Sequence, residues 1–151
     1  MKKQIIIIIT GTILLISASA VMAFCKTKAG MEDKSNSAII GAWQLDSYKY
    51  GSTSSSFTTV TSDRIHIKMI TENRFLWAIY DATTKQIVSS AGGTYSLKGE
   101  KCIESVDYGY NNDNILGTKS NFIIRIEDDV IFLSGSLGIE YKIEEIWKKV
   151  K

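Results

Sequence analysis

The sequence contains no proline, two cysteines and a single histidine, His66. Without proline, the turns have to be made by Gly, Asn, Asp and Ser. No second histidine and no Cys-x-x-Cys pair accompanies His66, so the spacing of a usual zinc site is missing. Two cysteines do not make a disulfide framework, and we expect Cys102 to be buried as a small hydrophobic residue. The chain is therefore not predicted to be a metal-stabilised or disulfide-stapled domain.

Catalytic signatures are missing as well. The serine-rich loop at 52–56 has no Gly-x-Ser-x-Gly arrangement and no histidine to serve as its base. The acidic pairs Asp128-Asp129 and Glu144-Glu145 are adjacent in sequence, whereas glycosidases need two carboxyl groups that face each other across the substrate. We therefore expect a protein that is not an enzyme and has no metal or cofactor.

A surplus of charge is absent from most of the chain. The formal net charge is +2, and Lys2 and Lys3 supply it, because residues 1–23 contain no acid. Without these two lysines, 16 basic residues balance 16 acidic ones. Nucleic-acid binders normally carry a basic excess, so nucleic acid is not an expected partner.

The first residues have the parts of an export signal in the usual order. Lys2-Lys3 give a positive start, residues 5–16 are mostly apolar, and residues 18–23 offer two cleavage sites with small side chains. We predict a signal peptide at 1–23 and a protein that is periplasmic or secreted. An uncleaved anchor is the alternative, because the apolar run approaches the ~20 residues that span a bilayer.

Cys25 follows this segment and is the candidate for a lipid anchor. Ala23 suits the lipoprotein cleavage motif, but Phe24 is bulkier than the residue that motif requires. Membrane contact is expected only through the signal peptide or through lipid at Cys25. Residues 24–38 are polar and aperiodic, which predicts a tether to a single domain at 39–151.

From Ile39 onward, short β-like segments alternate with turn residues. A Gly92-Gly93 pair interrupts one of them, which indicates a bulge or a sharp bend. The last segment has the composition of a helix as well, but its apolar residues alternate as in a strand. The pattern predicts an all-β fold of about eight antiparallel strands. The segments are 43–50, 64–70, 74–80, 86–91 with 94–97, 102–108, 120–127, 130–134 and 140–150.

Gly41-Ala42-Trp43 stands at the start of the first strand and resembles the Gly-x-Trp signature of the lipocalin (calycin) superfamily. The resemblance implies a single antiparallel lipocalin-like β-barrel. In such a barrel Trp43 would close one end, and Lys148 or Lys149 would place a cation over its ring. The chain is also similar to uncharacterised exported lipocalin-like proteins of bacteria, in the stretches 68–71, 77–81, 91–95 and 144–147.

Fatty-acid-binding members of this superfamily carry an inward Arg-x-Tyr on the last strand. The corresponding place here holds Glu145-Ile146-Trp147, and an acid there disfavours a carboxylate ligand. We expect a small apolar or amphiphilic ligand with a neutral or cationic head, bound inside the barrel by Trp77, Tyr95, Glu145 and Trp147. The alternative is that the face carrying Glu145 is exposed to solvent.

Two further expectations concern the barrel interior. Residues 64–70 alternate, with His66 and Lys68 on the face opposite the apolar residues, so we expect both to be solvated. A haem site would instead require His66 to point inward.

The alternative function is an envelope interaction protein or inhibitor that acts through its loops. Such a protein would have a filled barrel rather than a cavity.

Overall fold

The structure is a computed structural model that describes residues 37–137 and 141–151. The predicted export signal at 1–23 and Cys25 in the predicted tether lie outside the described residues. A helical turn at 37–39 precedes the sheet. No helix in the described part of the chain is long and apolar enough to cross a membrane. The strands are Gly41–Tyr50 (β1), Thr58–Thr59 (β2), Arg64–Ile70 (β3), Arg74–Asp81 (β4), Ile87–Lys98 (β5), Lys101–Tyr110 (β6), Lys119–Glu127 (β7), Val130–Leu137 (β8) and Tyr141–Lys149 (β9).

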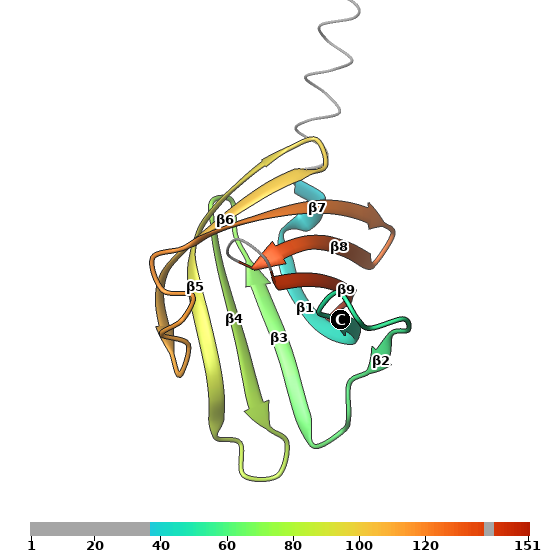
Figure 1. The fold of residues 1–151 in the computed structure, drawn as a ribbon, viewed down its shortest axis with the longest axis vertical. Helices are drawn as coiled ribbons and strands as arrows, with labels where there is room; N and C mark the ends of the chain where they lie inside the picture. The colour runs from blue at the N-terminus through green and yellow to red at the C-terminus, as the bar shows by residue number, and fades with distance from the viewer. Residues whose placement is uncertain (1–36, 138–140) are drawn as a thin grey trace, which may run out of the picture.

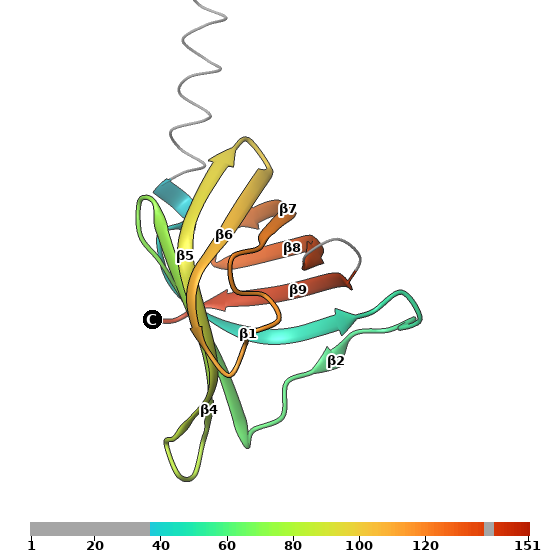
Figure 2. The same ribbon diagram turned by 60° about the vertical axis from the view of Figure 1, so that its left-hand side comes forward.

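Eight of these strands form a closed barrel, and the two-residue β2 pairs at the side of β1. Neighbouring strands are antiparallel, and β9 pairs with β1 to close the sheet. In Figures 1 and 2, β3, β4 and β5 run along the long axis while β7, β8 and β9 cross them steeply, as tilted strands of a small barrel do. The predicted all-β class, the antiparallel barrel and the strand count are confirmed, and the last segment is a strand.

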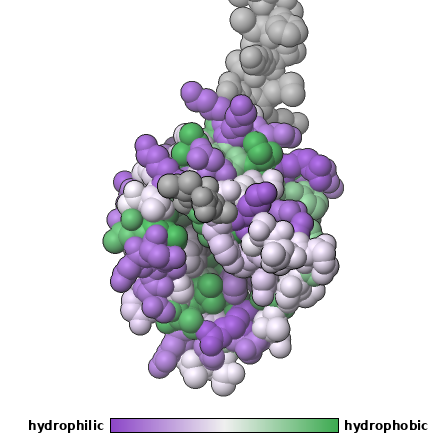
Figure 3. All heavy atoms as spheres, in the orientation of Figure 1, coloured by the Kyte–Doolittle hydropathy of each residue, from purple (hydrophilic) through white to green (hydrophobic). Residues whose placement is uncertain are grey.

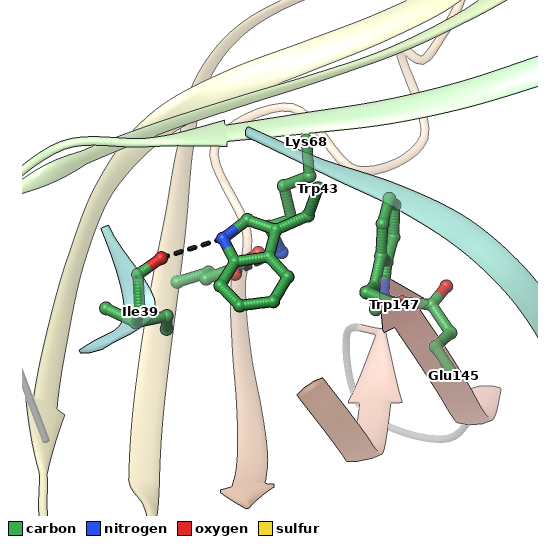
Figure 4. A network of polar contacts seen from close by, with 6 residues as sticks. Ile39, Trp43, Lys68, Glu145 and Trp147 are labelled. Carbon is green, nitrogen blue, oxygen red and sulfur yellow. Dashed lines mark hydrogen bonds and ion pairs between the residues drawn. The ribbon is translucent and has the colours of Figure 1, made fainter. Parts of the chain in front are cut away.

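Trp43 closes one end of the barrel. Its side chain is 0% exposed, and its Nε1 donates a hydrogen bond to the Ile39 carbonyl at 2.8 Å (Figure 4). The Lys149 ammonium lies 5.1 Å from the centre of the indole ring. Gly41 has φ +142°, a conformation that side chains disfavour, where the chain enters β1. The role predicted for Trp43 is confirmed with Lys149 as the cation, while Lys148 pairs with Asp46.

The register shifts in three strand pairs of the barrel wall, and two of these shifts, which mark bulges, bear on the glycine pair and on the site. The register of β5 against β6 shifts between Gly92 and Gly93, as the glycine pair predicts. A Cβ on Gly93 would clash with the carbonyl oxygen of Ser105, so only glycine permits this close approach of two backbones. The second bulge is in β1, between Leu45 and Ser47, opposite β9.

The β1 bulge changes which residues face the interior. Trp43 and Leu45 are buried before the shift, and after it Tyr48 lies opposite Glu145 while Tyr50 lies opposite Ile143. Side chains opposite each other in an antiparallel pair share one face of the sheet. The extra residue therefore turns Tyr48 and Tyr50 inward, although simple alternation from Trp43 would turn them out.

Strand register arranges the inward side chains in rows. Consecutive rows are about 7 Å apart, because each lies two residues further along its strand. The residues of the first row are buried, and those of the third are half-buried, so the rows lead from the closed end to the open mouth. From the closed end outward, they are Ile70–Phe75–Gly93, Lys68–Trp77–Ala91 and His66–Ile79–Ser89.

Candidate ligand cavity

The barrel contains a cavity of about 410 Å³. This volume lies within the range of small-molecule sites. In Figure 3 the face toward the viewer is hollowed, with apolar residues inside the hollow. Most of the lining is apolar, contributed by Ile67, Trp77, Ala78, Ile79, Ile115, Phe122, Leu133, Leu137, Ile143 and Trp147. The polar and charged lining consists of Tyr50, His66, Lys68, Ser89, Glu104, Asn112, Asn114, Tyr141 and Glu145.

Glu145 is buried in the wall of this cavity. Ile143, Glu145 and Trp147 all face inward, as their alternation predicts, and not toward solvent. The Glu145 Oε1 accepts a hydrogen bond from the Tyr50 hydroxyl at 2.6 Å, and its Oε2 accepts one from Trp147 Nε1 at 2.9 Å. Burial raises the pKa of Glu145, although these two donors and the Lys68 ammonium oppose the shift. The cavity therefore holds a carboxyl group whose pKa lies above its ordinary value.

Lys68 is buried too, and the expectation that it is solvated was wrong. Its residue is 5% exposed, and its ammonium forms an ion pair with Glu104 from the other side of the barrel. Three aromatic rings surround the ammonium, with centres 5.2 Å away for Phe75 and 6.0 Å away for Phe122 and Trp147. Burial is the largest effect and opposes the charge on Lys68, but the Glu104 and Glu145 carboxylates together favour that charge, and the pKa of Lys68 is raised. An internal cation thus forms a direct ion pair with one of two buried acids.

His66 lies on the same inward face as Lys68, one row nearer the mouth. The prediction that the two residues share a face is confirmed, but that face is the barrel interior and not the solvent side. The imidazole is half-buried, and its burial, together with the Arg64 charge, lowers the pKa of His66. Within residues 37–137 and 141–151, neither ring nitrogen has a hydrogen-bond partner.

Three of the four predicted site residues line the cavity, namely Trp77, Glu145 and Trp147. Tyr95 does not: it lies opposite Glu104 in the β5–β6 register, but its hydroxyl turns away and donates to the Thr71 carbonyl at 2.8 Å. Sequence reasoning missed the other eight polar residues of the lining, which are Tyr50, His66, Lys68, Ser89, Glu104, Asn112, Asn114 and Tyr141. No group of three His, Cys, Asp or Glu residues in the described ranges is placed to hold a metal ion.

Comparison with solved structures defines the class of protein as a lipocalin-like barrel. The chain is similar to a lipocalin-like protein from Bacteroides uniformis ATCC 8492, with 18% sequence identity and a TM-score of 0.55 over 75% of this chain and 99% of that chain. At this identity the likeness establishes the fold alone. Residues 38–151 match the model of a domain of unknown function, DUF4488, and the chain belongs to that family. No curated protein matches the sequence.

Proposed function

We propose that this protein is an exported, non-catalytic barrel that binds a small amphiphile with a neutral or cationic head in its interior. The observation that carries the proposal is Glu145, a buried carboxyl group in the wall of an open and mainly apolar cavity. The size of that cavity supports ligand binding over a filled barrel that acts through its loops.

The charges in the cavity favour a cation over an anion. The Lys68 ammonium is engaged by Glu104, whereas Glu145 forms no ion pair within the described part of the chain. Its hydrogen bonds come from two neutral donors, and each carboxylate oxygen keeps a lone pair for another partner. A carboxylate ligand would meet this second acid, which has no direct ion pair in the described residues. An ammonium group would be attracted to it and to the faces of nearby aromatic rings such as Trp77.

Fluorescence titration of the cavity tryptophans tests the proposal. Decylamine, decanol and decanoate share one chain length and differ in the charge of the head, and all are used below their micelle concentrations. We expect decylamine to bind about tenfold more tightly than decanoate, which corresponds to about 1.4 kcal/mol. Glu145→Gln should reduce this ratio while the circular dichroism spectrum stays that of a β-barrel.

The adjacent residue provides a matched control. Glu144 faces outward and pairs with Lys49 at 2.7 Å, so Glu144→Gln removes one negative charge from the same strand without touching the cavity. We expect this variant to keep the amine-to-acid ratio of the unaltered protein. Tighter binding of decanoate than of decylamine, or an equal effect of both substitutions, would contradict the proposal.

A further inference from the structure

We infer that the ligand is polar at both ends, and that His66 at the cavity mouth recognises a second, neutral hydrogen-bonding group such as a hydroxyl. This inference rests on the proposed function and narrows its ligand class from a simple amphiphile to a chain with a polar group at each end. The buried charges hold one end, and the mouth holds the other.

The strand register places His66 where the far end of a bound chain would lie. His66 belongs to the outermost of the three rows, together with Ile79 and Ser89, and all three side chains line the cavity. The row that contains Lys68 is about 7 Å deeper. On β9 the solvent exposure of the inward residues likewise increases, from buried Glu145 to Tyr141, which lines the mouth and is 52% exposed.

The deep and the outer polar groups differ in how far their hydrogen-bonding capacity is used. In the deep part, Lys68 is paired with Glu104, and Glu145 accepts from Tyr50 and Trp147. At the mouth, neither His66 nor the cavity-lining Asn114 has a hydrogen-bond partner within the described ranges. If the apolar end of a chain covered His66 and Asn114, these polar groups would lose their hydrogen bonds to water and gain none in return. Such a loss costs free energy.

The chemistry of His66 selects a neutral group. Because burial and the nearby Arg64 lower the pKa of His66, the neutral imidazole is favoured, and this form offers one donor and one acceptor. A hydroxyl group also offers both, so it can pair with either ring nitrogen. Asn112 supports the rim, since its amide donates to the Ser89 hydroxyl and to the Ser90 carbonyl. The mouth thus carries hydrogen-bonding groups beside apolar Ile79.

Two matched pairs of compounds test the inference. Decylamine is compared with ω-hydroxydecylamine, and decanol with the decanediol that has a hydroxyl at each end. We expect the added hydroxyl to tighten binding about three- to tenfold in both pairs, as one neutral hydrogen bond does. In His66→Leu this gain should vanish, while decylamine itself still binds. His66→Gln retains a donor and an acceptor and should keep part of the gain.

The outcomes separate this inference from the proposed function. If the amine is preferred over the acid but the hydroxyl brings no His66-dependent gain, the inference alone fails. If the gain is present without a preference for the amine, only the charge selectivity under the proposed function fails. If none of the four compounds binds, both fail. Haemin is a further control, and a Soret shift that His66→Leu abolishes would overturn the inference in favour of iron ligation.

Discussion

Replacement of Lys68 by methionine separates the charge of this side chain from its packing. Methionine keeps an unbranched stem of similar length, so the substitution mainly removes the ammonium. The Lys68 and Glu104 side chains are 6% and 9% exposed, so solvent screens neither charge well. Loss of one partner from a buried pair leaves an uncompensated charge and costs about 3–5 kcal/mol. That is a large part of the ~5–15 kcal/mol that stabilises a typical domain.

Urea unfolding followed by tryptophan fluorescence measures this loss, provided that the denaturant slope stays constant. The pH dependence gives a second measurement. In the unaltered protein the raised pKa of Lys68 contributes stability that is lost only at alkaline pH, so this term is constant from neutral to mildly acidic conditions. In the variant, the buried carboxylates lack a cation and their cost is relieved as they take up protons. The deficit of Lys68→Met should therefore shrink as the pH falls.

A double variant distinguishes the cost of an unpaired buried charge from a general failure to fold. Lys68→Met combined with Glu104→Met replaces the whole pair by apolar side chains, and such replacements are often neutral or stabilising. We expect the double variant to be at least as stable as the unaltered barrel. The reasoning is refuted if Lys68→Met costs less than about 1 kcal/mol at neutral pH, or if the double variant is as unstable as the single one.

Three further predictions follow from the closed end, the cavity and the predicted export signal. Trp43→Ala should cost about 3–5 kcal/mol in urea unfolding, because it removes a fully buried indole and its bond to Ile39, and a cost below about 1 kcal/mol would contradict the role of Trp43. Decylamine affinity should fall as the pH is lowered through the raised pKa of Glu145, because protonation removes the carboxylate that attracts the amine; Glu145→Gln should flatten this profile in the same fluorescence titration. Intact-mass analysis of the expressed protein should show a start near Val21, Phe24 or Cys25, and a mass that still includes Lys2 and Lys3 would rule out cleavage of a signal peptide.

Alternation in the sequence identifies the two faces of a strand but not which face is inside. On β9 two apolar residues, Ile143 and Trp147, accompany Glu145, and choosing the more apolar face as the inner one was correct. On β3 the same rule failed, because its outward face carries Met69, which is 47% exposed, while Lys68 on the other face is buried. The partner that makes this burial tolerable, Glu104, lies 36 residues away in sequence. Closure of the barrel brings Lys68 and Glu104 together, and the sequence of neither strand alone indicates this ion pair.

Because of the β1 bulge, a second part of the site could not be predicted from the sequence. A shift of one residue exchanges the two faces of a strand, and nothing in the residues around Asp46 marks the shift between Leu45 and Ser47. Without that bulge, Tyr50 would point outward and the Glu145 Oε1 would lose its hydroxyl donor. The closed end, in contrast, could be predicted, because Gly41 and Trp43 act through local geometry and the cation over the indole comes from the last strand.

The residues that sequence reasoning misplaced are mostly those that make the cavity chemically distinctive. A barrel interior built for stability alone would be filled with apolar side chains, since a buried ion pair contributes on average no more than well-packed apolar residues of the same volume. Lys68 and Glu104 instead face an open cavity that also contains Glu145 and His66. Departures from the hydrophobic pattern are expected where a protein trades stability for function. These inward polar groups therefore support a specific ligand over a nonspecific apolar one, and the matched amine, alcohol and acid probes test that choice.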